Sequence, residues 1–151
     1  YEMDKRIREW CFGSLDGGYD GELFDGVLPR TDAYKGKSAE ELTYEDIAKG
    51  LLEVDTAGWA EPWEVLSKRI LDGFFDAAKK AEANGAENIV IVSHGMTIAT
   101  FIKLLDSRRP KFQGLDNGSV THLTYSDGNF SIGEIGDMSY RELGREILNA
   151  E

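Results

Sequence analysis

A histidine and a glycine come directly after an apolar run in the stretch IVIVSHGMT, residues 89–97. The histidine, His94, is one of only two in the chain. A residue at the carboxyl end of a buried strand, with a helix starting behind it, lies where open α/β sheets bind ligands. A histidine there can donate a hydrogen bond to a phosphoryl oxygen and stabilise charge during phosphoryl transfer. The spacing alone leaves a structural histidine at a turn as an equal alternative.

The residues after His94 favour an anion as the ligand. Gly95 has no side chain, so the backbone can approach a bound group closely. The predicted helix over 97–105 offers backbone N–H groups and the positive end of its dipole. We therefore predict that Gly95 and the amides after it line a phosphate pocket. The other histidine, His122, falls inside an alternating strand pattern, which favours a surface or packing role.

Three elements must position this histidine. The run NIVIV, residues 88–92, is short, β-branched and apolar, which is typical of a strand buried on both faces of a parallel sheet. Before it, apolar residues recur at three- and four-residue spacing over 65–81 and predict a long amphipathic helix. Pro62 suits the first turn of that helix and Gly85 its end. A second helix, over 97–106, follows the strand.

The remaining segments complete an α/β layered domain. Five glycines among Asp and Tyr within residues 6–29 predict a long loop. Capping patterns at Ser38 and at Thr43 predict two helices. Asp127-Gly128 predicts a hairpin turn between two strands, and Ser139 is expected to cap a terminal helix.

Three motifs, in order along nearly the whole chain, resemble the histidine phosphatase superfamily. IVIVSHGMTIATFI is similar to its second histidine motif, RIREWCFGSLDG to its glutamate segment, and LDNGSVTHLTYSDGNFSIGEIGD to its closing hairpin. Members of the family include phosphoglycerate mutases, broad-specificity phosphomonoesterases and fructose-bisphosphatase domains. The resemblance implies a three-layer, phosphoglycerate mutase-like α/β fold, with a mostly parallel central sheet flanked by helices. It implies a single domain over residues 1–151.

The resemblance also implies a mechanism and the residues that perform it. A histidine in an N-terminal Arg-His-Gly motif attacks the phosphoryl group and becomes phosphohistidine, and water or a second hydroxyl then takes the phosphate. Glu9 matches the proton donor and acceptor, which protonates the leaving alcohol and later activates water. His94 matches the second histidine, which stabilises the phosphoryl charge. Gly95 and Asn117 match substrate-binding positions, and the family pattern implies no cofactor and no metal.

The nucleophile of that mechanism is missing from this sequence. No Arg-His-Gly occurs in it, and the family's phosphate-binding arginine before the glutamate segment is also absent. We interpret the sequence as N-terminally incomplete, with the first strand and the nucleophilic histidine lost, so the chain alone is expected to be inactive. Loss of a central strand exposes apolar surface and strand edges, which predicts a possible homo-oligomer.

The family match leaves the activity open between two enzymes. The leading prediction is a phosphomonoester hydrolase acting on small phosphate esters, and the alternative is a cofactor-dependent phosphoglycerate mutase. The sequence HGMTI lacks the asparagine expected after the glycine in typical mutases. The interval from Glu9 to His94 is also short for the mutase insertion. Both differences favour the phosphatase.

Two functions of other classes are also considered. A non-catalytic phosphate-binding fragment is the alternative that follows from the missing nucleophile. An acyl hydrolase is suggested by VSHGM, which looks like a histidine-glycine oxyanion loop. That enzyme also needs a Gly-x-Ser-x-Gly elbow, and no serine here has glycines two residues to both sides. The acyl hydrolase is therefore disfavoured.

Composition narrows the partners and the compartment. The net charge of −11 repels nucleic acid and anionic membranes at long range, so the predicted partner is a small phosphorylated metabolite. No apolar run approaches the length of a membrane helix. The single cysteine, Cys11, excludes an internal disulfide framework and fits a reducing compartment, which predicts a cytoplasmic protein.

Overall fold

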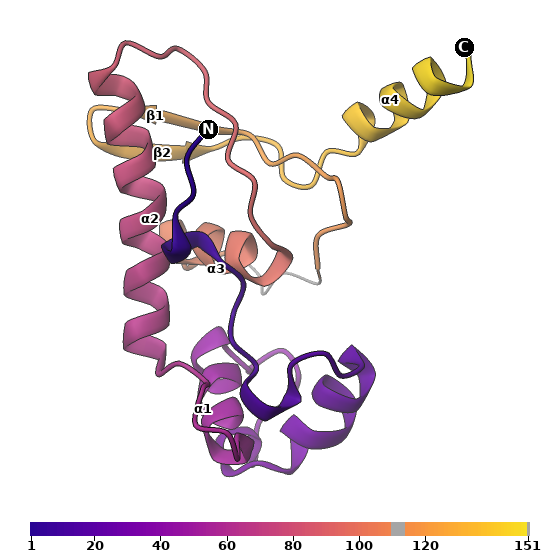
Figure 1. Ribbon diagram of the computed structural model, residues 1–151. Coiled ribbons are helices and arrows are strands. Elements are labelled where there is room, and N and C mark those ends of the chain that lie inside the picture. The colour runs from indigo at the N-terminus through magenta and orange to yellow at the C-terminus, as the bar shows by residue number, and fades with distance from the viewer. Residues whose placement is uncertain (110–113, 151) are drawn as a thin grey trace.

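The computed structural model describes residues 1–109 and 114–150 and has an α/β fold (Figure 1). Its regular elements are α1 (Tyr44–Val54), α2 (Trp63–Ala83), α3 (Gly95–Leu105), β1 (Leu123–Ser126), β2 (Asn129–Ile132) and α4 (Ser139–Asn149). Helices α2 and α3 pack against each other, and the β1–β2 hairpin lies beside them (Figure 1). Within the described residues, no helix is both long and apolar enough to cross a membrane.

The helix predictions for the middle of the chain are largely confirmed. Helix α2 starts after Pro62 and stops before Gly85, whose φ of +70° is the left-handed conformation that ends helices. Thr43 caps α1 in a reciprocal capping box with Asp46. The helix predicted at Ser38 is wrong. Its side-chain pattern is present, since Glu41 accepts from the Ser38 amide at 2.8 Å, but only a turn forms there.

The long loop predicted for residues 6–29 is also corrected. A helical turn at Glu22–Val27 is followed by a second one at Leu28–Arg30. Leu23 and Leu28 are buried in the core from these turns. Burying two leucines outweighs the turn-forming preference of the glycines around them, because local propensities are weaker than tertiary packing.

The hairpin forms as predicted, with Leu123 opposite Ile132 and Ser126 opposite Asn129. Both turn residues have positive φ, +52° for Asp127 and +77° for Gly128, as the two-residue turns that suit hairpin twist require. These two antiparallel strands form the sheet of the described residues. A mostly parallel central sheet is therefore not formed by this part of the chain.

The strand predicted at 88–92 does not form, and its burial on both faces is wrong. Val90 is 92% exposed and Val92 85% exposed, and the segment runs as irregular chain between α2 and α3 (Figure 1). A strand is regular only when neighbouring backbone completes its hydrogen bonds. No strand pairs with 88–92 among the described residues. The β-branched residues at 88–92 therefore suit a strand, but the neighbouring strands that would pair with them are absent among the described residues.

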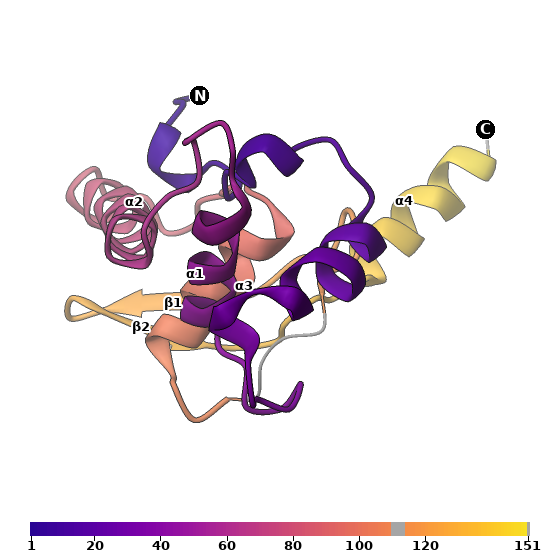
Figure 2. The same ribbon diagram turned by 90° about the horizontal axis from the view of Figure 1, so that it is seen from below.

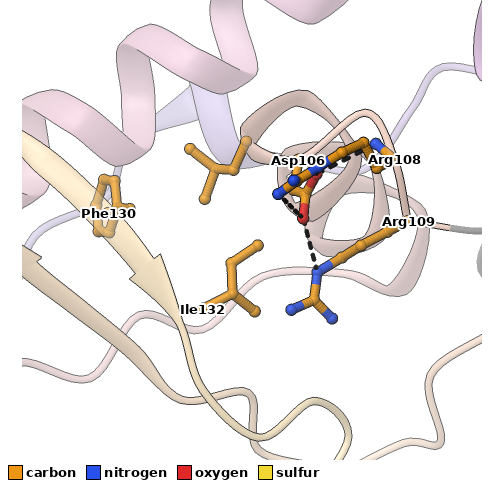
Figure 3. Close-up of a pocket in the computed structure, with 6 residues that line it drawn as sticks. Asp106, Arg108, Arg109, Phe130 and Ile132 are labelled. Atoms are coloured by element: carbon orange, nitrogen blue, oxygen red, sulfur yellow. Dashed lines mark hydrogen bonds and ion pairs between the residues drawn. The ribbon is translucent and has the colours of Figure 1, made fainter.

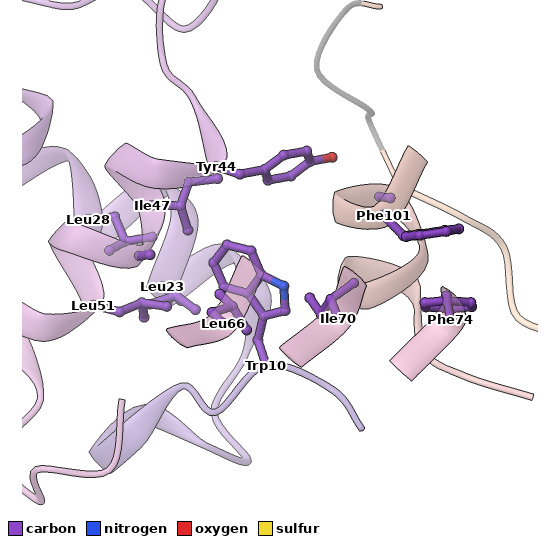
Figure 4. Packing of buried hydrophobic residues seen from close by; sticks show 12 residues of the cluster. Trp10, Leu23, Leu28, Tyr44, Ile47, Leu51, Leu66, Ile70, Phe74 and Phe101 are labelled. Carbon is purple, nitrogen blue, oxygen red and sulfur yellow. The ribbon is translucent and has the colours of Figure 1, made fainter. Parts of the chain in front are cut away.

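The buried hydrophobic side chains form one cluster, which includes Trp10 (Figure 4). Phe74 of α2 stacks on Phe101 of α3 with ring centroids 4.2 Å apart, and Phe130 of the hairpin meets Phe101 edge-on. Trp10 is 3% exposed, and its indole N–H donates to the Thr100 hydroxyl at 3.1 Å. The segment that carries Glu9 is thereby anchored to α3.

Helix α4 stands apart from this core in both views (Figures 1 and 2). None of its residues is buried, and Leu143 and Leu148 are 56% and 75% exposed. The prediction that Ser139 caps this helix is wrong: Ser139 is its first residue, after Met138 at the N-cap position, and the Asp137 carboxylate accepts from the Ser139 amide at 2.8 Å and the Ser139 hydroxyl at 3.0 Å.

Gly73 allows the N-terminal segment to lie directly on α2. A Cβ at this position would be 2.7 Å from Ile7 Cγ2 and 3.0 Å from Arg6 Cβ. Glycine costs about 1 kcal/mol relative to alanine inside a helix. The close approach of residues 6–7 explains why a glycine is nevertheless used.

We predict that Gly73→Ala lowers the free energy of unfolding by about 1–2 kcal/mol, because overpacking outweighs the gain in helix propensity. Urea denaturation measures the change. Gly144→Ala in α4 is the matched control, since a Cβ there has no neighbour within 4 Å and no stability should be lost. An equal gain from both substitutions would show that the 6–7 segment does not rest on Gly73.

Candidate active site

The carboxylate of Glu9 lies at the amino end of α3. Its Oε1 accepts from the backbone N–H of Thr97 at 3.0 Å and of Trp10 at 2.9 Å. Its Oε2 accepts from the N–H of Met96 at 3.2 Å. These donors and the positive end of the helix dipole favour a negative charge at this position. The glutamate picked out by sequence is thus held next to the histidine motif.

Bonds between side chains and backbone hold residues 7–9 along the start of α3. The Ser93 hydroxyl donates to the carbonyl of Ile7 at 2.7 Å, and the Thr97 hydroxyl donates to the carbonyl of Arg8 at 2.7 Å. Thr97 is fully buried. Both ends of the SHGMT turn therefore contact the segment that leads into Glu9.

His94 is the residue immediately before α3 and has an extended backbone, with φ −124° and ψ 160°. Its side chain is exposed and does not cap the helix. The sequence interpretation as a structural turn histidine would place the ring in bonds to the turn. His94 is exposed instead and is therefore accessible to a ligand in solution.

Gly95 and Asn117 are brought to the same end of α3. A Cβ on Gly95 would meet only the Leu115 carbonyl oxygen, at 4.0 Å, so the segment before Asn117 passes close to Gly95. Asn117 is exposed in a turn, and its carbonyl accepts from Arg141 Nη1 at 3.1 Å. Within the described residues, the space beside Gly95 is otherwise open.

The phosphate pocket predicted from the amides needs a correction. The N–H groups of Met96 and Thr97 already donate to Glu9, so they are not vacant donors for a phosphate. Glu9 is distant from this helix end in sequence, so the pattern around His94 gives no sign of an intramolecular carboxylate there. Any oxyanion here has to share the helix end with the negative charge of Glu9.

Asp55 is a structural carboxylate that no sequence motif indicated. It accepts backbone N–H bonds from Ser14 at 2.8 Å, Trp59 at 2.5 Å and Ala60 at 2.7 Å. These bonds, led by that from Ala60, hold the pKa of the Asp55 carboxyl well below its usual range. Asp55 thereby joins the turn after the glutamate segment to the loop before α2.

A depression of about 250 Å³ between the end of α3 and the hairpin is a separate feature (Figure 3). Asp106 lies 2.9 Å from Arg108 Nε and 3.7 Å from Arg109 Nε. The pKa of the Asp106 carboxyl is lowered, and the largest cause is the hydrogen bond from the Arg108 side chain. Glu9, His94 and Asn117 do not line this depression, and both arginines already have an anionic neighbour.

No group of three or more His, Cys, Asp or Glu side chains is arranged to hold a metal ion within residues 1–109 and 114–150. The described site instead consists of a carboxylate, which already accepts from the helix-end amides, and an imidazole. These groups suit proton transfer and oxyanion binding.

The family model of the histidine phosphatase superfamily (branch 1) matches residues 1–138. A phosphoglycerate mutase from Bacillus anthracis str. Sterne is similar in structure, with a TM-score of 0.82 and 31% sequence identity. The similarity covers 95% of this chain and 63% of the mutase chain, so this chain spans less than two thirds of that protein. No curated protein sequence matches significantly.

We predict that Glu9→Gln lowers the free energy of unfolding by about 1 kcal/mol, because an amide NH₂ cannot accept from the helix N–H groups and carries no charge for the dipole. Urea denaturation at neutral pH tests this. The control is Glu22→Gln, on an exposed turn away from α3. Equal stability of the Glu9→Gln variant and the wild type would mean that the carboxylate does not bind the helix end.

Proposed function

Since this chain belongs to the histidine phosphatase superfamily, we propose that it is the part of a phosphomonoester hydrolase that carries the proton donor and the second histidine. The substrate is a small phosphate ester, and the reaction passes through a phosphohistidine. The observation that carries the proposal is the position of the Glu9 carboxylate, bonded to the amides two and three residues after His94.

In the proposed reaction, a histidine from outside this chain attacks phosphorus, and the ester P–O bond breaks. Glu9 gives its proton to the leaving alcohol, while the His94 ring donates to a phosphoryl oxygen. A water then attacks the phosphohistidine, loses its proton to Glu9 and releases phosphate. Oε1 of Glu9 accepts two backbone bonds and Oε2 accepts one, so Oε2 is the oxygen we assign to proton transfer.

The proposal includes where the nucleophile enters. Residues 88–93 lead directly to His94, and their side chains at Val90 and Val92 are uncovered. We propose that a strand carrying the nucleophilic histidine pairs beside 88–93, which would build the mostly parallel, three-layer sheet of a single domain. The charges support this proposal. The chain has a net charge of −11 and places the Glu9 carboxylate at the helix end, so the cationic groups that neutralise a phosphate would have to come from the added segment.

A cofactor-dependent phosphoglycerate mutase is the alternative within the family. The similar structure from Bacillus anthracis str. Sterne, described as a phosphoglycerate mutase, favours it. The HGMTI sequence and the short Glu9–His94 interval favour the phosphatase. Adding 2,3-bisphosphoglycerate to the protein with its nucleophile and following the interconversion of phosphoglycerates separates these activities.

A non-catalytic phosphate-binding fragment is the alternative from another class. It shares the same oxyanion contacts at His94 and Gly95, and Asn117 as a neighbouring group. The two functions differ in turnover after the nucleophilic strand is supplied, because only the hydrolase would then release phosphate from an ester. Retained phosphate affinity without turnover in that complemented protein would identify a binding function.

We predict that inorganic phosphate shifts the NMR ring signals of His94 and leaves those of His122 in place. His94→Ala should weaken phosphate binding about tenfold, the usual size of one lost charge-assisted hydrogen bond. His122→Ala is the matched control, because His122 lies immediately before β1 and its ring contacts Tyr140 of α4. The chain alone should not hydrolyse p-nitrophenyl phosphate. A shift of both rings, or of neither, would contradict the assigned site.

We also propose that the chain self-associates while residues 88–93 remain uncovered. The expected result in light scattering is a mass that rises with concentration above the 16.8 kDa of one chain. Val90→Lys with Val92→Lys should lower that mass by adding charge to the exposed segment. Val65→Lys, at another exposed apolar side chain on α2, is the control. A monomer at every concentration would refute self-association.

A further inference from the structure

A buried arginine on α2 binds the backbone that carries Glu9. Arg69 is 8% exposed. Its Nη1 donates to the carbonyls of Arg6 at 2.8 Å and Arg8 at 3.0 Å, and its Nη2 donates to the carbonyl of Glu9 at 3.1 Å. Three carbonyls of one short, irregular segment are therefore bound by a single guanidinium group.

Glu61 neutralises this arginine from the opposite side. Arg69 Nε donates to Glu61 Oε1 at 2.8 Å, and Arg69 Nη2 donates to Oε2 at 2.7 Å. The Glu61 side chain is 12% exposed, so the pair is largely desolvated. A buried ion pair is an expensive way to gain stability, and apolar residues of similar volume often serve as well. The three carbonyl contacts give this pair a role that apolar packing cannot fill.

Arg69 and the helix-end amides both bind Glu9. Arg69 fixes the main chain of Glu9, and the amides of Met96 and Thr97 receive its side chain. The backbone of Arg8 and Glu9 belongs to neither a helix nor a paired strand, so no regular ladder holds it. A lysine has no planar fork and cannot reach the three carbonyls and the carboxylate together.

We propose that Arg69, held by Glu61, is the positioning residue for Glu9. As a catalytic role for Glu9 is itself proposed, this inference rests on the proposed function in that respect. Arg69 does not touch the reacting atoms. It sets the place of the carboxylate by fixing the backbone from which the side chain extends, so its loss displaces Glu9 from α3 while the remainder of the core stays packed.

The test compares backbone amide NMR signals in the full chain. Arg69→Lys should move the amide proton signals of Met96 and Thr97 toward their positions in Glu9→Gln, and leave that of Ile102 unchanged. Arg8→Met is the matched control. Arg8 reaches the same Glu61 oxygen from the surface, at 2.7 Å, but its guanidinium does not bind the Glu9 carbonyl. Wild-type signals for Met96 and Thr97 in a folded Arg69→Lys protein would overturn the proposal.

A second variant covers the case in which Arg69→Lys does not fold. Arg69→Met with Glu61→Met removes both buried charges and keeps the side-chain volume, while the N–H groups that donate to the three carbonyls are lost. The same shifts of Met96 and Thr97 are expected. Unchanged shifts in this variant would equally overturn the proposal.

Phosphate binding provides a readout that a purely structural role would not move. In the wild type, Glu9→Gln should strengthen binding of inorganic phosphate about threefold, because a like charge beside the anion is removed. In the Arg69→Lys background this gain should disappear, since Glu9 no longer stays at the helix end. An equal gain in both backgrounds would refute the coupling. If phosphate binds neither protein, the proposed function fails, whereas the amide shifts still decide the role of Arg69.

Discussion

The buried pair of Arg69 and Glu61 is the contact on which the arrangement of the site depends. Residues 6–9 have no strand partner in the described chain, and their only regular feature is the turn Lys5–Ile7. Arg69 replaces a ladder with three bonds to their carbonyls. Gly73, one turn further along α2, lets the same segment lie close enough for those bonds. The charged side chain of Arg69 and the lack of a side chain at Gly73 thus both allow residues 6–9 to be held against α2.

This constraint creates a competition at the start of α3. The helix end attracts anions, and the Glu9 carboxylate is the anion that the chain itself delivers there. A phosphoryl group beside His94 therefore meets a like charge unless Glu9 carries a proton. In the proposed reaction the first step begins with that proton on Glu9, which removes this repulsion. After transfer, the helix amides stabilise the carboxylate that remains.

The sequence could predict those parts of the fold whose cause is local. The period of apolar residues in α2, the Thr43 capping box of α1 and the Asp127-Gly128 turn all depend on neighbours within a few residues. The helical turns around Leu23 and the exposure of Val90 depend on what packs against them, and that information lies elsewhere in the chain or outside it.

The sequence motifs indicate Glu9 and His94 as site residues, but they carry no signal for the side chains that hold Glu9 in place. Glu9 and His94 were chosen by resemblance to a family, and the chain brings them to one helix end. Arg69 left no signal because it binds carbonyl oxygens, which every residue has, so the identity of its partners is invisible in the sequence. Asp55 was missed for the same reason, since its partners are backbone N–H groups.

The site keeps its arrangement although the described residues form no parallel sheet, and the type of bond explains why. In a sheet, the carboxyl ends of strands are aligned by ladder bonds, which need every neighbouring strand. Here the Ser93 hydroxyl, the Thr97 hydroxyl and Arg69 bond the backbone of residues 6–9 directly to α2 and to the start of α3. These bonds need no further strand. The Glu9 carboxylate is thus positioned by the described residues alone, and the strand that we propose to dock at 88–93 would have to position only its own histidine.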